Sequence, residues 1–160
     1  MPLAYAEYGS YSADGSQMAV TFRSQANRNW KRYRGGWKAD IYLFNFNTLT
    51  SEDISASEVA GDEFPMWSGR YIYFLSDRGT ELRMNLWRYN LDTKAFDQLT
   101  HFTDYDVHYP SLGPGDIVFE AGGKLYLFQL DKQLMKEVRV SIATAHFMLT
   151  RRFYKIILIS

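Results

Sequence analysis

The sequence predicts an all-β fold, and three observations support this prediction. Aromatic residues make up 17% of the 160 residues, with 12 Tyr and 11 Phe, a composition typical of sheets. Helical periodicity is hard to find before residue 130, whereas short β-rich runs recur between clusters of Gly, Asp, Asn, Ser or Pro. Runs such as "YIYFLS" and "IYLFNF" are continuously apolar, which indicates strands covered on both faces.

A repeat becomes visible when these runs are aligned. Long runs at residues 18–22, 71–76 and 116–121 each follow a turn, and each is followed by a second apolar run and a shorter closing run. The second runs begin at Ile41, Leu86 and Leu125, which are 45 and 39 residues apart (86 minus 41 and 125 minus 86). This is the period of a β-propeller blade with four short strands. The sequence therefore predicts a partial β-propeller of four-stranded antiparallel blades, with a sandwich of irregular hairpins as the alternative.

The repeat also sets the expected division of the chain. We expect a first blade in residues 1–61, a second in 62–107 and a third in 108–140, with the first residues alternatively completing an earlier blade. Residues 141–160 match no blade and are interpreted as a divergent tail, with a truncation or a reading-frame artefact as alternatives. Because an incomplete propeller exposes the faces of its end blades, we expect this chain to self-associate or to have a frayed terminal blade.

The first blade contains a cationic and aromatic insertion at residues 28–38. It lies between the long run at residues 18–22 and the second run that begins at Ile41, where a propeller places a hairpin at its rim. Three aromatic residues, Trp30, Tyr33 and Trp37, are interspersed among the cations. The cations are Arg28, Lys31, Arg32, Arg34 and Lys38.

In a propeller, this hairpin emerges on the same face as the links between blades, and those links are acidic here. Three interpretations of the insertion follow. Its cations pair with carboxylates of the same chain, or bind a peptide carboxylate or another anion, or bind nucleic acid. We favour the first and regard nucleic acid as the least supported. The candidate contact residues for an external ligand are Arg28, Trp30, Lys31, Arg32, Arg34 and Trp37, and the acids on the same face are Glu58, Asp62, Glu63, Asp104 and Asp106.

Bulk composition limits the classes of partner. The 18 Lys and Arg balance the 18 Asp and Glu, and the pI is about 6.8, so no global field would recruit a polyanion. Cysteine is absent, which excludes disulfides and thiolate metal sites and makes the cytoplasm the default location. The first ten residues lack the pattern of a signal peptide, and the longest apolar run, "IILI", is too short to cross a bilayer. We therefore expect no membrane partner.

A search for catalytic or metal-binding chemistry predicts none. No "GxSxG" nucleophile elbow occurs, and the serines lie in turns such as "SADGS" and "WSG". His101 and His108 flank Asp104 and Asp106, but residues of an inter-blade link do not converge as a zinc site requires. The segments "GPG" and "AGG" are not followed by a helix and are therefore not phosphate cradles. We expect no catalytic residue, metal or cofactor in this chain.

Four stretches of the sequence together resemble the amino-terminal six-bladed propeller of tricorn proteases. More loosely, each unit is similar to the propeller repeats of periplasmic translocation proteins, of prolyl oligopeptidase relatives and of WD40-like proteins. The resemblance covers residues 3–140, and its most specific parts are "NWKRYRGG" and "THFTDYDV". The stretches are "RNWKRYRGGWKADIYLFNF", "DEFPMWSGRYIYFLSDRGT", "MNLWRYNLDTKAFDQLTHFTDYDV" and "YPSLGPGDIVFEAGGKLYLFQL".

This resemblance implies a cytoplasmic serine peptidase that degrades oligopeptides downstream of the proteasome as a hexamer. In that family the propeller is expected to act as a gated channel for peptides, and its partners are the remaining blades and the catalytic domains. The chain holds about three of six blades, so no catalytic residue of the family maps onto any position here. The alternative function is a general interaction propeller that binds an acidic protein or nucleic acid through the Arg/Lys/Trp insertion.

Overall fold

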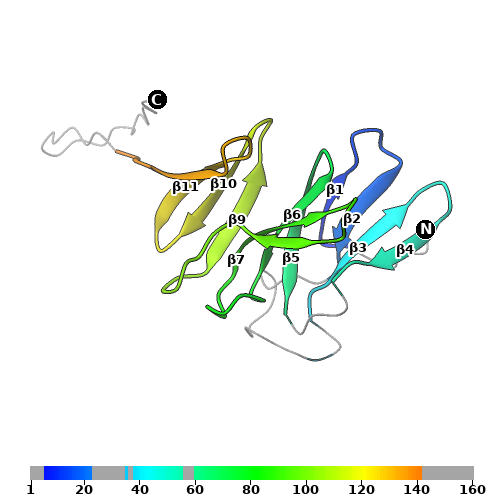
Figure 1. Cartoon of the computed structure of the whole chain (residues 1–160), viewed down its shortest axis with the longest axis horizontal. Coiled ribbons are helices and arrows are strands. Elements are labelled where there is room, and N and C mark those ends of the chain that lie inside the picture. The colour runs from blue at the N-terminus through cyan, green and yellow to red at the C-terminus, as the bar shows by residue number, and fades with distance from the viewer. Residues whose placement is uncertain (1–5, 23–34, 36–37, 56–59, 142–160) are drawn as a thin grey trace, which may run out of the picture.

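Three four-stranded antiparallel sheets make up the described part of the chain, which confirms the all-β prediction (Figure 1). The computed structural model describes residues 6–22, 35, 38–55 and 60–141, and these residues contain no helix. In every sheet the strand order follows the chain, so each strand pairs with the next one through a hairpin. We call each sheet a blade and number the blades in chain order.

The twelve strands divide evenly among the three blades. Blade 1 contains β1 (Tyr8–Tyr11), β2 (Gln17–Thr21), β3 (Ile41–Asn45) and β4 (Thr50–Asp53). Blade 2 contains β5 (Asp62–Ser68), β6 (Tyr71–Ser76), β7 (Asn85–Asn90) and β8 (Phe96–Gln98). Blade 3 contains β9 (Val107–Leu112), β10 (Asp116–Ala121), β11 (Lys124–Gln129) and β12 (Leu134–Val138).

The blades stand side by side in chain order (Figure 1). Their apolar faces are buried against one another. Strand β6 shows this directly, because its alternate residues enter two different cores. Ile72 and Phe74 belong to the core shared with blade 1, whereas Tyr73 and Leu75 belong to the core shared with blade 3. This double burial is the physical reason for the continuously apolar run "YIYFLS", and it confirms the inference of strands covered on both faces.

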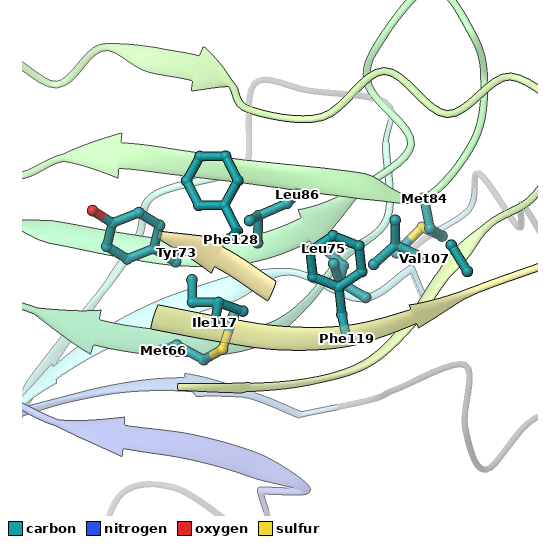
Figure 2. Close-up of a cluster of buried hydrophobic side chains, with 10 residues drawn as sticks. Met66, Tyr73, Leu75, Met84, Leu86, Val107, Ile117, Phe119 and Phe128 are labelled. Atoms are coloured by element: carbon teal, nitrogen blue, oxygen red, sulfur yellow. The ribbon is translucent and has the colours of Figure 1, made fainter. Parts of the chain in front are cut away.

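The core between blades 2 and 3 draws on both sheets, as Figure 2 shows. Phe119 from β10 and Leu86 from β7 are almost fully buried. A four-stranded blade cannot bury both of its own faces, so each blade depends on its neighbours for stability. The buried members of this core are Met66, Tyr73, Leu75, Met84, Leu86, Val107, Ile117, Phe119, Ala121 and Phe128.

The outer hairpins repeat in atomic detail. In blade 1, Asn45 Oδ1 accepts hydrogen bonds from the backbone N–H groups of Asn47 and Thr48, and in blade 2, Asn90 Oδ1 does the same for the two equivalent groups. Four residues after these positions, and after the equivalent Gln129, the backbone is left-handed. The three left-handed residues are Leu49, Lys94 and Gln133, with φ of 57°, 61° and 50°.

In two blades, a side-chain hydroxyl accepts a backbone hydrogen bond at the start of the third strand. Ser55 Oγ accepts a hydrogen bond from the N–H of Ile41 at 2.9 Å, and Thr100 Oγ1 accepts one from the N–H of Leu86 at 2.8 Å. Ile41 and Leu86 are 45 residues apart, and so are Ser55 and Thr100, which is the spacing found in the sequence. The first period of the repeat is therefore a structural period, carried by the same hydrogen bonds in successive blades.

The first strands of the blades lie next to one another. Strand β5 packs against β1 on one side and β9 on the other. A hydrogen bond joins the first two blades here, because the N–H of Trp67 in β5 donates to Ser10 Oγ in β1 at 2.9 Å. The first strands therefore form the innermost part of this fan of blades.

Candidate functional site

The cationic insertion lies outside the described residues, except for Gly35 and Lys38. Arg28, Trp30, Lys31, Arg32, Arg34 and Trp37 all fall in the undescribed part, so their proposed contacts with peptides or anions stay a prediction. Lys38 is described, and its ammonium group forms an ion pair with Asp40. This pair agrees with the interpretation that cations of the insertion bind carboxylates of the same chain.

The acids expected on the same face have several different environments. Asp62 and Glu63 begin β5 and are 0% and 1% exposed, so they belong to the interior of blade 2. Asp106 is also buried, and its carboxylate accepts the N–H of Met84 at 3.1 Å. Asp104 is exposed on the link before β9, and Glu58 lies outside the described residues.

The partner of Asp62 is Arg78, in the segment that follows β6. Arg78 Nη2 donates to Asp62 Oδ2 at 2.8 Å, and its guanidinium group lies 4.0 Å from the ring centroid of Phe96. Burial raises the pKa of Asp62 to about 6, although the charge of Arg78 acts in the opposite direction. This pair holds the start of β5 to the turn after β6, and it serves the fold.

The three first strands converge on one hollow of about 220 Å³. Each of the three blades contributes its first strand to the lining of this hollow. Its described lining contains no charged residue and is made of backbone, rings and small or apolar side chains. The lining residues are Tyr8, Gly9 and Ser10 from β1, Phe64, Pro65 and Met66 from β5, and Pro110, Ser111 and Leu112 from β9.

Two of these strands bulge at the hollow in the same way. The pairing of β5 with β6 shifts between Glu63 and Met66, and the pairing of β9 with β10 shifts at the equivalent place. Each bulge contains an aromatic residue and then a proline. The aromatic residues are Phe64 and Tyr109, both left-handed, with φ of 55° and 50°. The equivalent position in β1 is Tyr8, which pairs without a bulge.

The bulges decide how the inner strands can interact with another chain. Edge strands normally offer a row of N–H and C=O groups to which an extended peptide can add as a further strand. Pro65 and Pro110 have no N–H, and a bulge interrupts the regular spacing of the remaining groups. In β5, the N–H of Trp67 is already engaged, because it donates to Ser10 Oγ of blade 1. The hollow can therefore contact an extended peptide without capturing it as an added strand.

A larger groove of about 520 Å³ lies between the hairpins of blades 1 and 2. Its lining mixes the carboxylates of Asp14 and Glu52 with Lys94 and the ring of Trp67. Lys94 Nζ is 3.8 Å from Glu52 Oε1, so these charges partly satisfy one another. Because blade 3 contributes nothing to this groove, we regard the inner hollow as the better candidate site.

The residues considered for metal binding do not converge. His101 Nδ1 lies 3.0 Å from Glu81 Oε1, whereas the ring of His108 contacts the ring of Tyr109. Among the residues that the structure describes, no group of three His, Asp or Glu side chains is arranged to hold a metal ion. The same residues include no helix long and apolar enough to span a bilayer.

Sequence reasoning missed the inner strands, although they carry a signal. The segments "YGSY", "FPMW" and "YPSL" align when residues are counted back from the hairpin that follows each of them, and each begins with an aromatic residue. Two of them continue with proline, which argues against a regular strand. Their common register becomes visible only after the pairing of β1, β5 and β9 is known.

Comparisons with known proteins agree with this architecture. A family model described as the tricorn protease N-terminal beta propeller domain matches residues 1–134. A tricorn protease homolog from Saccharolobus solfataricus is 30% identical over 116 residues, which cover 72% of this chain and 11% of the relative. The tricorn protease of Thermoplasma acidophilum is 26% identical over 112 residues, which cover 70% of this chain and 10% of the relative.

The fold similarity extends to a solved structure. The crystal structure of the tricorn protease matches 88% of this chain and 13% of its own chain, with a TM-score of 0.71 and 23% identity. The present chain thus spans only about a tenth of the length of these relatives. At this identity the structural match establishes the propeller architecture, which confirms the predicted fold class.

Proposed function

Because the chain belongs to the tricorn protease N-terminal β-propeller family, we propose that it forms part of a peptide channel in a tricorn-type peptidase. Oligopeptides would move along the inner strands, and hydrolysis would take place elsewhere in a longer polypeptide. The relatives support this division, since they are named as proteases and the matched region is about a tenth of their length.

The observation that carries the proposal is the chemistry of the inner hollow. A passage for peptides of varied sequence must avoid holding any of them strongly. The described lining has no charge that would retain acidic or basic peptides, and its prolines and bulges weaken strand addition. The contacts that remain are with rings, backbone and small side chains, and each of them is weak. This combination favours passage over capture.

The resemblance to tricorn proteases also supports a proposal about the role of the protein in the cell. It supports the degradation of oligopeptides downstream of the proteasome by a serine-type peptidase that assembles as a homo-oligomer. The remaining blades and the catalytic domains would be the direct partners of this region. No described residue is assigned a catalytic role.

The experiment narrows the hollow in the natural full-length polypeptide that carries this sequence. Ser111 lines the hollow and is exposed, so Ser111→Trp should obstruct it while leaving the cores intact. We expect kcat/KM for a long fluorogenic oligopeptide to fall several-fold more than kcat/KM for a short one. Ser51→Trp, on the exposed outer strand β4, is the matched control and should change neither value. Equal effects of the two variants would refute the channel role.

A further inference from the structure

We infer that the aromatic residue at one equivalent position of each inner strand forms a selective contact for bulky apolar side chains of a passing peptide. The three residues are Tyr8, Phe64 and Tyr109. This inference rests on the proposed channel function and adds a substrate preference to it.

Position along the inner strands relates the three residues, by pairing register in β5 and β9 and by residue count from the hairpin in β1. In β5, Phe64 and Pro65 lie between the paired residues Glu63 and Met66. In β9, Tyr109 and Pro110 occupy the same place between the paired residues at either side of the bulge. Counting back along β1 from its hairpin with β2 brings Tyr8 and Gly9 to this place. The same type of side chain therefore occurs at one level of the inner surface in all three blades.

The backbone at this level is strained in two blades. A left-handed conformation is unfavourable for any residue with a Cβ, and it is especially uncommon for a bulky aromatic residue. Phe64 and Tyr109 both adopt it, and a glycine at either position would avoid the cost. Strain that recurs at one level, at residues that face or adjoin a hollow, is a reason to look for a function of the side chains.

The rings are placed for contact with a ligand. The centroids of Tyr8 and Phe64 are 4.4 Å apart with the planes tilted by 45°, so the two rings form a continuous apolar surface across blades 1 and 2. Tyr109 is 70% exposed beside Pro110, which lines the hollow. This exposure leaves the ring available to a ligand.

The size and polarity of the hollow select the class of group. Its volume of about 220 Å³ is below the range of roughly 300–1,000 Å³ for small-molecule pockets, so it suits a single side chain. Met66 and Leu112 add apolar surface, and no charge in the described lining would compensate an entering carboxylate or ammonium group. The entry of a bulky apolar side chain is therefore favourable. The entry of a charged side chain is unfavourable, because it loses hydrating water and finds no opposite charge in the described lining.

The test uses fluorescence anisotropy with labelled eight-residue Gly/Ser peptides and the full chain. The peptides differ at one central position, which is Phe, Ala, Glu or Lys. We expect the Phe peptide to bind about threefold to tenfold more tightly than the Ala peptide, the range expected for one aromatic contact. The Glu and Lys peptides should bind no better than the Ala peptide.

Variants at Tyr109 test the assignment of the contact. Tyr109→Ala should bring the Phe/Ala ratio close to one, and Tyr109→Gly should do the same although it relaxes the backbone. Tyr109→Phe should keep the ratio. Tyr105→Ala is the control, since Tyr105 is also exposed, at 58%, but lies on the link before β9 and is not next to any residue that lines the hollow.

Two results would overturn the inference. One is a Phe/Ala ratio that Tyr109→Ala leaves unchanged, and the other is the absence of any preference for Phe, including the absence of binding. The hydrolysis experiment with Ser111→Trp decides the channel role independently. A block by Ser111→Trp without a preference for Phe would leave the proposed function standing and remove the selectivity.

Discussion

Arg78 and Asp62 form an ion pair inside blade 2, with Arg78 Nη2 2.8 Å from Asp62 Oδ2 and side-chain exposures of 4% and 0%. The pair joins the turn after β6 to the first residue of β5. The guanidinium group also lies over the rings of Phe74, Trp87 and Phe96. Aromatic faces attract a cation, so the rings and the carboxylate together replace the water that Arg78 gives up on folding.

Removal of Arg78 should therefore destabilise the chain strongly. Arg78→Ala leaves the carboxylate of Asp62 buried without its partner, and we expect the free energy of unfolding to fall by about 3–5 kcal/mol. Arg70→Ala is the control, because Arg70 and Asp92 form a pair at 3.6 Å with both side chains 65% exposed. That change should cost about 0–1 kcal/mol. Urea denaturation measures both, and similar losses would contradict the assignment of a buried pair.

The same carboxyl group should make stability depend on pH. Burial raises the pKa of Asp62 from 3.8 to about 6, so between these values the folded state binds a proton that the unfolded state releases. The free energy of unfolding contributed by this group therefore falls as the pH rises from about 4 to about 6. Because one pH unit of pKa difference corresponds to about 1.4 kcal/mol, the fall should exceed about 1 kcal/mol.

The control for this pH dependence is Asp62→Asn, which cannot titrate. The variant should be less stable overall, because the charge of Arg78 loses its counterion. Its unfolding free energy, measured by urea denaturation at several pH values, should lack the component that falls between pH 4 and pH 6. Parallel pH profiles for the two proteins would show that Asp62 does not titrate in this range.

A matched pair of exposed leucines tests the backbone of the outer hairpins. Leu49 is 59% exposed with φ of 57°, and Leu134 is 56% exposed within β12. Leu49→Gly should raise the free energy of unfolding by about 0.5–1 kcal/mol, because removal of a left-handed penalty of about 1–2 kcal/mol exceeds the entropic cost of glycine. Leu134→Gly should lower it by about 0.5–1 kcal/mol. Opposite signs in thermal unfolding are the expected result, and a stability loss at both positions would contradict it.

The strands could be predicted from the sequence because their signals are local. The run at residues 71–76 has apolar residues on both faces of the strand, and turn residues mark its two ends. The sequence therefore predicts β6 with the bounds that the structure shows. The 45-residue spacing of Ile41 and Leu86 also reflects a local fact, since each begins or nearly begins the third strand of its blade. Patterns of this kind need no knowledge of which strands meet.

The buried pair and the hollow could not be predicted in this way. Asp62 was expected among acids on the surface, because a charged residue in a polar link is normally solvated, and only the packing around Arg78 accounts for its burial. The hollow depends on Tyr8, Phe64 and Pro110, which lie in three strands far apart in the chain. Which strand is innermost follows from the contacts between blades, and a single sequence does not contain them.

The outward face of blade 3 leads to the last prediction, the self-association expected from the sequence. Leu125 in β11 and Val138 in β12 are direct cross-strand neighbours, and they are 40% and 38% exposed. They lie on the opposite face from Phe128, which enters the core with blade 2. Apolar side chains paired on an uncovered sheet favour association between chains, because the removal of apolar surface from water is favourable.

We therefore expect sedimentation velocity to show a concentration-dependent rise in mean size for the unmodified chain. The double variant Leu125→Lys with Val138→Lys should shift the distribution towards the monomer, because two adjacent ammonium groups repel each other and resist burial. Leu49→Lys adds a charge at an exposed leucine of blade 1 and should leave the association unchanged. A chain that stays monomeric at every concentration, or that responds equally to Leu49→Lys, would show that this face does not drive association.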